Sequence, residues 1–339
     1  MDLSGLNSII PTRYNDYICK FIDKKHVKKE TLVLRTLLLY FSEAGWMRAF
    51  VTHFFLARRV ALRFVAGETL EEAIQVTRTL NEKGLLVTLD FLGESVKDQK
   101  DARAVTEMYL ILVDRIHQEN LNASVSLKPT HLGLDISEEH CVNNIRAILT
   151  AAKRHDIPVT MDMESSKYTD ITLQIFRTMR LEHEFDNVGT VIQSALRRSE
   201  QDMKELAEEG SRIRLCKGAY LEAPDIAYAE KVDVDANYVR ILDQYLQAEA
   251  PAYLDIATHD EHMIVAAIEK IKHYDIPLER YEFQMLYGVR SSRQLELVEA
   301  GYKMRVYVPF GDAWYPYFMR RLAERPANLW FFARSLFRS

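Results

Sequence analysis

Two adjacent arginines near the carboxyl end of the chain are the residues most directly suited to chemistry. Arg320 and Arg321 lie in the stretch Arg305–Glu324, where a strand-like run that includes Tyr307 leads through a short turn into a helix. A guanidinium group offers a rigid fork of donors that matches a carboxylate or phosphate better than an ammonium group does. The pair therefore indicates an anionic small ligand, although adjacent arginines are also common on solvated surfaces.

Polar side chains also lie at or just after the ends of eight short apolar runs that are typical of buried strands. These side chains are Asp90, Glu94, Lys128, Asp162, Glu164, Gln193, Lys217, His259, Tyr287 and Tyr307. One or two such residues would be expected as helix caps or ion pairs at a rim. A polar residue at every strand end instead suggests a large polar ligand at the carboxyl ends of the strands, where the sites of barrel enzymes lie.

The runs alternate with longer amphipathic segments from residue 84 onward, which predicts repeated strand–helix units. We expect strands at Leu85–Phe91, Ala123–Lys128, Pro158–Met163, Val188–Gln193, Arg212–Lys217, Ala252–Thr258, Tyr281–Leu286 and Lys303–Pro309. The segments between them, such as Glu138–His155 and Gln201–Glu209, are long enough for right-handed parallel crossovers. Eight such units close a (βα)8 TIM barrel, which is the α/β fold predicted for this chain.

An open, doubly wound sheet is the alternative, and it would place a glycine-rich turn after the first strand. The segment after that strand is LGES, and neither GxGxxG nor a phosphate-binding P-loop occurs in the chain. The barrel is therefore favoured. Residues 1–83 show helical periodicity without a strand pattern, so we expect an N-terminal helical arm followed by a catalytic barrel domain over residues 84–339.

The composition argues against several classes of protein. The chain has 339 residues, of which 48% are hydrophobic and 27% charged, and its net charge of -5 gives no electrostatic footprint for nucleic acid. Its three cysteines, at unrelated spacings, indicate neither a disulfide framework nor a cysteine zinc site. A reducing compartment fits this cysteine usage, and no nucleic-acid partner is predicted.

The N-terminus lacks the basic and apolar regions of a signal peptide, so a cytoplasmic location is expected. The most apolar run, Thr31–Phe41, is too short to span a bilayer and predicts a buried helix. Two apolar segments with interspersed arginines, Gly45–Val65 and Asn328–Ser339, could lie on the inner face of an anionic membrane. They could also pack on the barrel and extend their arginines to water, and packing is the interpretation that we favour for Gly45–Val65.

Three kinds of chemistry fit the residues at the strand ends. Lys128 could form a Schiff base, as in an aldolase, if a desolvated pocket lowered its pKa. His259 and His262 could bind a metal with Asp162 or Glu164, because residues three apart share a helical face. Asp260 as a helix cap explains the same letters, THDEH, without an ion, so no metal is predicted. A redox cofactor is the third interpretation.

The redox interpretation depends on eight blocks of sequence. They are TLDFLGES, VSLKPTHLG, VTMDMES, GTVIQSALRRS, RIRLCKGAY, IATHD, YEFQMLYGVR, and RVYVPFG followed by YFMRRLAE. In order and spacing these blocks resemble the proline dehydrogenase family, including the proline dehydrogenase domain of bifunctional proline-utilization proteins. The resemblance covers about residues 84–330. Collinear blocks at successive strand ends are far more specific than any one block alone.

The resemblance implies a distorted (βα)8 barrel that binds FAD and oxidises L-proline to 1-pyrroline-5-carboxylate. It also implies a membrane quinone as electron acceptor and pyrroline-5-carboxylate dehydrogenase as the downstream enzyme in proline catabolism. The catalytic residues that it implies are Lys128, Asp162, Tyr307, Arg320 and Arg321. Of these, the two arginines and the lysine would hold the substrate carboxylate.

Further substrate contacts follow from the same resemblance. The residues that would complete the pocket around the pyrrolidine ring are Leu215, Ala219, Tyr220, Tyr307 and Tyr317. Glu94 matches a carboxylate that pairs with the first arginine and acts as a gate over the site. Asp162 matches an active-site acid with an orienting role.

The resemblance also implies a set of flavin contacts. They are Asp162, Gln193, Arg214, Cys216, Lys217, Gly218, Ala219, Thr258, His259 and Glu324. Gln193 and Arg214 match residues beside the isoalloxazine, and Arg214 would lie near the reactive nitrogen, where positive charge stabilises reduced flavin. The chain departs from some family members at Leu221 and Glu230, which leaves open how the adenine end of FAD is held.

Other functions stay open on the sequence alone. Hydroxyproline or another cyclic amino acid is an alternative substrate, because pocket details that set ring substituents do not emerge from one sequence. A Schiff-base aldolase using Lys128 and a non-catalytic barrel that binds an amino acid are alternatives from other classes. A yellow protein that L-proline bleaches anaerobically would separate the flavoenzyme from both.

Overall fold

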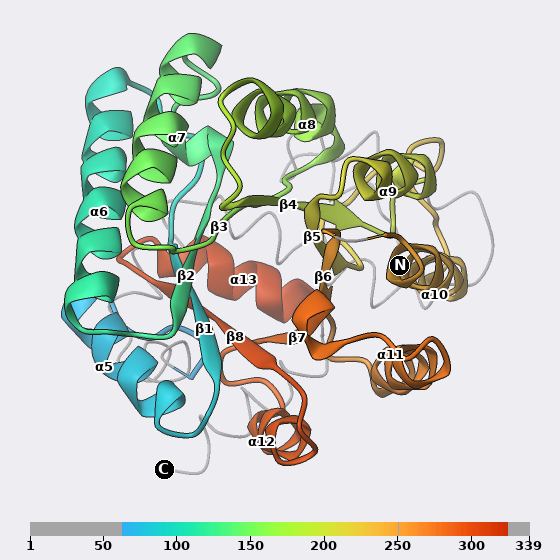
Figure 1. The fold of residues 1–339 in the computed structure, drawn as a ribbon. Coiled ribbons are helices and arrows are strands. Elements are labelled where there is room, and N and C mark those ends of the chain that lie inside the picture. The colour runs from blue at the N-terminus through green and yellow to red at the C-terminus, as the bar shows by residue number, and fades with distance from the viewer. Residues whose placement is uncertain (1–62, 250, 325–339) are drawn as a thin grey trace, which may run out of the picture. The chain divides into compact units, whose positions relative to one another are not determined.

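Eight parallel strands pair in chain order, and the last strand pairs with the first to close a barrel (Figure 1). This computed structural model describes residues 63–249 and 251–324. By its internal contacts the chain divides into two units, residues 64–312 and residues 1–63 with 313–339. The first unit contains the whole barrel, so the predicted (βα)8 fold is confirmed.

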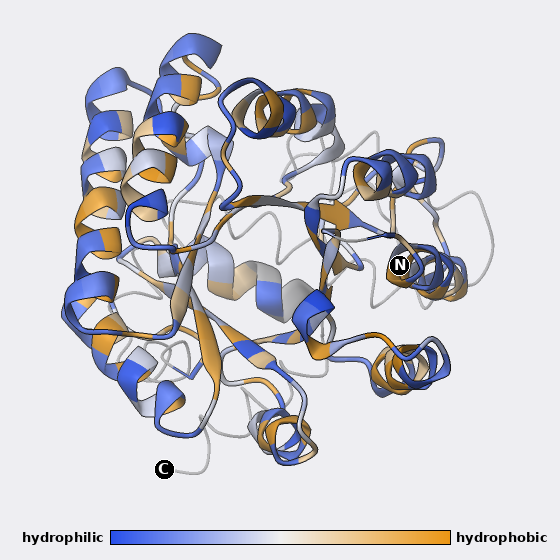
Figure 2. Ribbon diagram, in the orientation of Figure 1, coloured by the Kyte–Doolittle hydropathy of each residue, from blue (hydrophilic) through white to orange (hydrophobic). Residues whose placement is uncertain are grey.

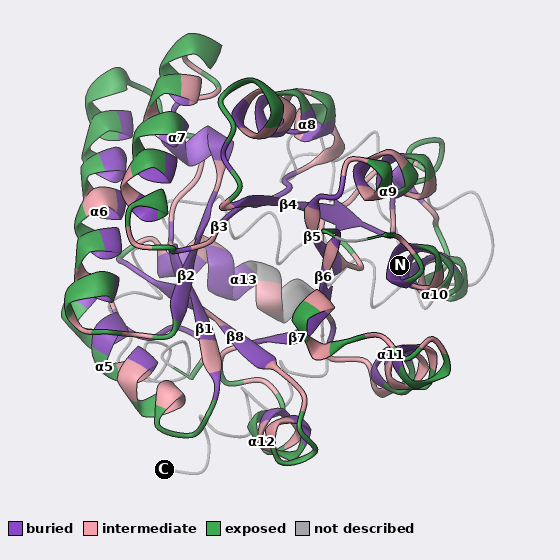
Figure 3. Ribbon diagram, viewed as in Figure 1, coloured by how far each residue is buried: buried purple, intermediate pink, exposed green. Residues whose placement is uncertain are grey.

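Each predicted strand run corresponds to one strand of the barrel. The strands are β1 (Leu86–Phe91), β2 (Ala123–Leu127), β3 (Val159–Met161), β4 (Val188–Gln193), β5 (Arg212–Cys216), β6 (Tyr253–Ala257), β7 (Tyr281–Leu286) and β8 (Met304–Phe310). They are buried along most of their length (Figure 3). This is the burial expected of parallel strands that are covered on both faces.

Helices surround the strands as an outer ring (Figure 1). They are α5 (Leu70–Asn81), α6 (Gln99–Gln118), α7 (Glu138–Lys153), α8 (Thr169–Arg177), α9 (Ser199–Glu208), α10 (Lys231–Leu246), α11 (Glu261–His273) and α12 (Ser291–Glu299). Each helix mixes hydrophilic and hydrophobic residues along its length (Figure 2), as amphipathic helices do. Their outward faces are exposed (Figure 3). Helix α13 (Trp314–Glu324) belongs to the other unit and is described by itself.

Local capping residues begin several of these helices. The Thr69 side chain accepts a hydrogen bond from the Glu72 backbone, and the Glu72 side chain returns one, which forms a capping box at α5. Asp98 and Ser137 accept from backbone amides at the starts of α6 and α7. Asp260 does the same at α11, as predicted from THDEH. These caps satisfy amide groups that a helix start would leave unpaired.

The two faces of the strands carry different kinds of residue. Outward side chains such as Val87 and Leu89 are fully buried against the apolar faces of the helices. Inward side chains are mostly polar, and Thr88 and Ser124, for example, share a hydrogen bond of 2.7 Å between their hydroxyl oxygens. Barrel interiors are usually filled by bulky aliphatic residues. The polar interior is therefore a feature that needs a functional or structural explanation.

Several predictions concern residues outside the described part of the chain. Thr31–Phe41, the tail Asn328–Ser339 and nearly all of Gly45–Val65 lie there, so their predicted roles stay predictions. Within the predicted arm of residues 1–83, α5 packs against β1 and β8. In residues 63–249 and 251–324, no helix combines the length and apolar character needed to cross a membrane.

Candidate active site

Asp162, directly after β3, is the centre of a hydrogen-bonded group inside the barrel. Its Oδ1 accepts from Arg214 Nη1 at 2.6 Å and from Ser126 Oγ at 2.8 Å, and its Oδ2 accepts from Tyr307 OH at 2.7 Å. These residues come from β2, β5 and β8, far apart in sequence. They meet because alternate side chains of every strand point inward and the strands close into a ring.

Lys128 joins this group at the end of β2. Its Nζ contacts both carboxylate oxygens of Asp90, at 3.1 and 2.9 Å, and lies 3.7 Å from Asp162 Oδ2. Lys128 is only 12% exposed and Asp90 only 1% exposed, so this is a buried ion pair. We call Asp90, Ser126, Lys128, Asp162, Arg214 and Tyr307 the Asp162 cluster.

The electrostatics of the cluster keep Lys128 charged. Burial by itself works to lower the pKa of the Lys128 ammonium, but the charges of Asp90 and Asp162 outweigh it and raise the pKa above its ordinary value. A Schiff-base nucleophile needs the opposite shift, because the neutral amine attacks the carbonyl. The geometry therefore favours a role for Lys128 as a fixed positive charge.

Arg214 is almost fully enclosed and has one donor to spare. Its Nε donates to Gln284 Oε1 at 2.7 Å, and its Nη1 donates to Ser126 and Asp162. The guanidinium carbon also lies 5.3 Å from the centre of the Tyr307 ring. Its Nη2 is buried and has no hydrogen-bond partner among the described residues. Since buried donors are nearly always paired, this nitrogen is suited to a ligand.

The loops after β4 and β5 form a second part of the site. Backbone hydrogen bonds of 2.8 Å join Ser194 to Cys216 and Ala195 to Lys217, so the two loops run side by side. Gly218 has a φ of 101°, and a Cβ there would lie 2.8 Å from Gln193 Oε1. Only glycine fits this position without strain. The result is bare backbone next to the Gln193 amide.

Lys217, in the loop after β5, belongs to a network of four charged side chains. Lys217 Nζ contacts Asp235 at 2.5 Å and Asp260 at 2.7 Å, and Lys231 contacts the same two carboxylates. Burial works to raise the pKa of Asp260, but the two lysines outweigh it and lower the pKa. The predicted cofactor residue Lys217 is thus held in place by its own ion pairs.

Thr258 and His259 are fixed around the start of α11. Thr258 Oγ1 accepts from the Asp260 backbone at 3.1 Å, and His259 Nε2 accepts from the Leu286 backbone at 2.8 Å. His259 is thereby tied to the end of β7. Within the described residues, no group of three or more His, Cys, Asp or Glu side chains is arranged to hold a metal ion.

The remaining predicted site residues of the barrel unit lie on β5 and in two loops. Leu215 alternates with Arg214 along β5 and is fully buried in the apolar core. Glu94, Ala219 and Tyr220 are half-buried in loops after β1 and β5. Their predicted contacts stay predictions.

The predicted residues of α13 belong to the other unit of the chain. There the Arg321 guanidinium carbon lies 5.3 Å from the centre of the Tyr317 ring. The side chains of Arg320 and Glu324 are outside the described part of the structure. The carboxylate clamp, the Glu94 gate and the Glu324 flavin contact therefore remain predictions.

Sequence reasoning gave no role to several residues that the structure places in the site. Asp90 was recognised only as a polar residue at a strand end, and Glu164 only as that and as a possible metal ligand. Ser126 and Gln284 were not singled out. Ser126 lies two residues before Lys128, so strand alternation alone would have placed both inside the barrel. Glu164 accepts hydrogen bonds from Thr130, at 3.2 Å from its amide and 2.7 Å from its hydroxyl. Burial raises the pKa of Glu164 to about 7.

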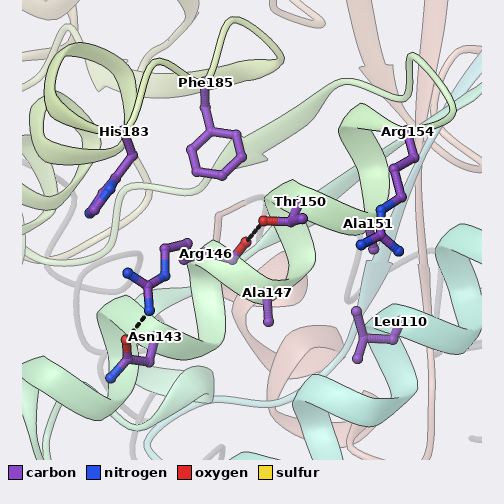
Figure 4. A pocket seen from close by; sticks show the side chains of 9 residues that line it. All are labelled: Leu110, Asn143, Arg146, Ala147, Thr150, Ala151, Arg154, His183 and Phe185. Carbon is purple, nitrogen blue, oxygen red and sulfur yellow. Dashed lines mark hydrogen bonds between the residues drawn. The ribbon is translucent and has the colours of Figure 1, made fainter.

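A groove of about 470 Å³ lies elsewhere, on the outside of the barrel (Figure 4). It lies over α6, α7 and the segment before β4. The residues that line it are Leu110, Asn143, Arg146, Ala147, Thr150, Ala151, Arg154, His183 and Phe185. None of them is a predicted site residue, and the groove is separate from the strand ends that carry the Asp162 cluster.

Comparison with known proteins identifies relatives along nearly the whole chain. It is 40% identical over 304 residues to proline dehydrogenase 1 of Bacillus subtilis (strain 168), which covers 90% of this chain and 99% of that one. It is 38% identical over 280 residues to proline dehydrogenase of Deinococcus radiodurans, which covers 82% of this chain and 90% of that one.

A similar solved structure is that of proline utilization A (PutA) from Bdellovibrio bacteriovorus inactivated by N-propargylglycine. The TM-score is 0.75 at 26% identity, and the match covers 87% of this chain but only 36% of that longer chain. The family model described as proline dehydrogenase matches residues 73–334. With the barrel, the strand-end cluster and these matches in agreement, the chain belongs to the proline dehydrogenase family.

Proposed function

We propose that this protein is an FAD-dependent enzyme that oxidises L-proline to 1-pyrroline-5-carboxylate, the first step of proline catabolism. The observation that carries the proposal is the buried Asp162 cluster at the carboxyl ends of the strands, in a chain that belongs to the proline dehydrogenase family. Active sites of barrel enzymes lie at this end of the barrel. The cluster places a fixed cation, an acid and a phenol within one small region.

Two features of the structure fit a flavin. The buried Nη2 of Arg214 has no partner among the described residues, and Gly218 leaves bare backbone beside Gln193. The residues that would hold FAD are Asp162, Gln193, Arg214, Cys216, Lys217, Gly218, Ala219, Thr258 and His259, with Glu324 from α13. When bound, FAD would supply the redox chemistry by accepting a hydride from the substrate. The side chains of the protein would bind the flavin and the substrate and orient them toward each other.

The charge balance of the Asp162 cluster indicates what the substrate site still needs. The two basic side chains of the cluster, Lys128 and Arg214, are each already paired with a carboxylate, from Asp90 and Asp162 respectively. A secondary amine must be deprotonated before it can lose a hydride, and proline in that form is an anion. Enclosing an anion in a balanced cluster would be costly without further donors. Arg320 and Arg321, on α13, are the residues that we propose supply them.

The remaining roles follow from chemistry at named atoms. Lys128 would contribute an ammonium to the carboxylate, and Tyr307 would pack on the pyrrolidine ring while its hydroxyl remains fixed by Asp162. The other pocket residues would be Leu215, Ala219, Tyr220 and Tyr317. Glu94 would pair with Arg320 and act as a gate. Hydroxyproline or another cyclic amino acid is the alternative substrate.

The partners and location form a further part of the proposal. A membrane quinone would accept the electrons, and pyrroline-5-carboxylate dehydrogenase would consume the product. The enzyme would be cytoplasmic and in peripheral contact with the inner face of the membrane. The support for this part is the family membership, because the segments predicted to touch the membrane lie outside the described residues.

The colour and reactivity of the purified protein test the proposal. We expect a yellow protein whose flavin absorbance is bleached by L-proline without oxygen, with 1-pyrroline-5-carboxylate formed in equal amount. Hydroxyproline should bleach it more slowly at the same concentration. A colourless protein that FAD does not reconstitute, or a yellow one that no cyclic amino acid bleaches, would refute the proposal.

A further inference from the structure

Two side chains of β7 form a continuous hydrogen-bonded path to Arg214. Glu282 and Gln284 are two residues apart, so both point into the barrel. Gln284 Nε2 donates to Glu282 Oε1 at 2.7 Å, and Gln284 Oε1 accepts from Arg214 Nε at 2.7 Å. Gln284 is 3% exposed and Glu282 is 1% exposed. Neither residue has a role in the function proposed above.

Glu282 fixes which way the Gln284 amide faces. Burial works to raise the pKa of Glu282, but Arg305 and Arg212 outweigh it and hold the pKa at about 2. Glu282 is therefore an ionised acceptor that cannot donate a hydrogen bond. Only the NH2 end of the Gln284 amide can face it. The carbonyl end must then face away, toward Arg214.

Glu282 is itself held firmly by Arg305 on the neighbouring strand, β8. Arg305 donates from Nε to Oε1 at 2.5 Å and from Nη2 to Oε2 at 3.0 Å. Arg305 Nη1 also donates to the Val87 backbone oxygen at 2.8 Å, which anchors it to β1. The two-point contact fixes the plane of the carboxylate as well as its position. A rigid carboxylate gives the amide of Gln284 a rigid direction.

The consequence for Arg214 is a guanidinium group held on two edges. Gln284 holds Nε, and Asp162 with Ser126 holds Nη1. A planar group fixed at two of its nitrogens cannot rotate about either contact alone. Its third nitrogen, Nη2, is the buried donor without a partner among the described residues. Gln284 therefore helps decide where that free donor points.

We propose that Gln284 is a positioning residue for Arg214 and that Glu282 sets the direction of its amide. The proposal rests on the proposed function in one respect, namely that Arg214 lies beside the flavin. A residue that only filled the barrel interior would affect stability without moving Arg214. The two possibilities separate when position, flavin potential and stability are measured on the same variants.

The central variant is Gln284→Met, which keeps the length of the side chain and removes both hydrogen bonds. Glu282 retains its contacts with Arg305, Arg212 and Tyr253, so no buried carboxylate is left alone. Gln284→Asn is a second variant, because its shorter amide can reach Glu282 or Arg214 but not both. Asn187→Leu is the matched control. Asn187 lies just before β4, away from the site, and its partly buried side-chain amide donates to the backbone carbonyls of Leu149 and Ile157. The substitution removes both hydrogen bonds.

The first measurement concerns position and needs no redox chemistry. Crystal structures of the wild type and Gln284→Met should show the Arg214 guanidinium rotated about its contact with Asp162 in the variant only. An Arg214 that keeps its orientation without the Gln284 acceptor overturns the proposal, whether or not the protein proves to be a proline dehydrogenase. Failure of the proposed function alone would leave this structural result standing.

The second measurement is the reduction potential of the bound flavin. In Gln284→Met and Gln284→Asn we expect the reduced flavin to be favoured about tenfold less, which is a potential about 30 mV lower for a two-electron couple. The kcat for proline should fall about tenfold, while the affinity for a cyclic carboxylate with oxygen in place of the ring nitrogen stays within about twofold. Asn187→Leu should keep the wild-type potential. Equal potentials in all four proteins, or an equal shift in the control, would overturn the proposal.

Discussion

The inside of the barrel is lined mainly by polar and charged side chains, whereas the layer between its strands and helices is filled by apolar ones. Inside, Arg305 pairs with Glu282 and Arg212 pairs with Asp255, each within hydrogen-bond distance, and both carboxylates are buried. Outside the strands, the layer is apolar, with residues such as Leu112 fully buried. Apolar packing is non-directional and tolerates change in shape better than a charged network does. The difference indicates that the outer layer provides most of the stability and the interior sets geometry.

The largest effect should come from breaking an interior ion pair. Arg305→Met leaves Glu282 without the partner that binds both of its oxygens, and removing one member of a buried pair costs about 3–5 kcal/mol. Urea unfolding monitored by circular dichroism would measure the change in the free energy of unfolding. Arg240→Met, which removes an exposed arginine paired with Glu200, is the matched control and should change it by less than about 1 kcal/mol. Similar losses in the two variants would contradict the comparison.

A cavity in the outer layer should lower the free energy of unfolding by nearly as much but leave proline oxidation unchanged. Leu112→Ala removes a fully buried side chain on α6, and such changes cost about 2–5 kcal/mol. Because the space lies outside the barrel, KM for proline should stay within about twofold of wild type. Steady-state kinetics at a temperature where both proteins are folded would check this. A large rise in KM would show that the outer layer also sets the site geometry.

Glu164 should make stability depend on pH within a defined window. Burial raises its pKa in the folded protein to about 7, above the value of 4.5 for an exposed glutamate. Between these two values the folded state binds more protons than the unfolded state. The free energy of unfolding should therefore fall as pH rises from about 4.5 to about 7, by up to roughly 3 kcal/mol.

The matched variant for this prediction is Glu164→Gln, which keeps the size of the side chain and cannot ionise. Its stability should lack the Glu164 contribution, so the difference between the two proteins should grow through the same window and level off above it. Urea midpoints measured at half-unit pH steps would give the difference. A constant difference across the window would show that Glu164 titrates normally.

The last prediction tests the second unit of the chain. Arg321→Met should lower kcat/KM for proline by about 30-fold or more, because truncating one partner of a buried charge contact costs about 2–5 kcal/mol. The content of bound flavin should not change. The surface variant Arg240→Met serves again as control and should stay near wild type. A kcat/KM for Arg321→Met within about threefold of wild type would remove it from the carboxylate clamp.

Much of the barrel could be predicted because each strand carries its own signal. The runs Val188–Gln193 and Tyr281–Leu286 match β4 and β7 to the residue. For the third strand the prediction was Pro158–Met163, and β3 is shorter, at Val159–Met161. Pro158 has no amide hydrogen to donate to a ladder, although its carbonyl accepts from Val125 at 3.0 Å. Local composition thus gives the elements more reliably than their ends.

The partners inside the site could not be predicted in the same way. Lys128 and Asp90 are 38 residues apart in sequence, and Arg214 and Gln284 are 70 apart. Their pairing depends on the register of the strands and on ring closure, which no local pattern encodes. The segment THDEH shows that a local pattern can predict a helix cap but not a partner distant in sequence. Asp260 caps α11 as predicted, but nothing local shows that it also holds Lys217.

Arg305 lies on β8, the strand that closes the barrel by pairing with β1. Its side chain also donates a hydrogen bond to the Val87 carbonyl on β1, 218 residues earlier in the chain. Contacts so distant in sequence form late, because loop closure must precede them. A nascent chain that ends before β8 would expose the unpaired edges of β1 and β7. It would also leave the Glu282 carboxylate without Arg305 in an unclosed barrel. Synthesis of the last strand should therefore mark the moment at which this barrel becomes resistant to proteases.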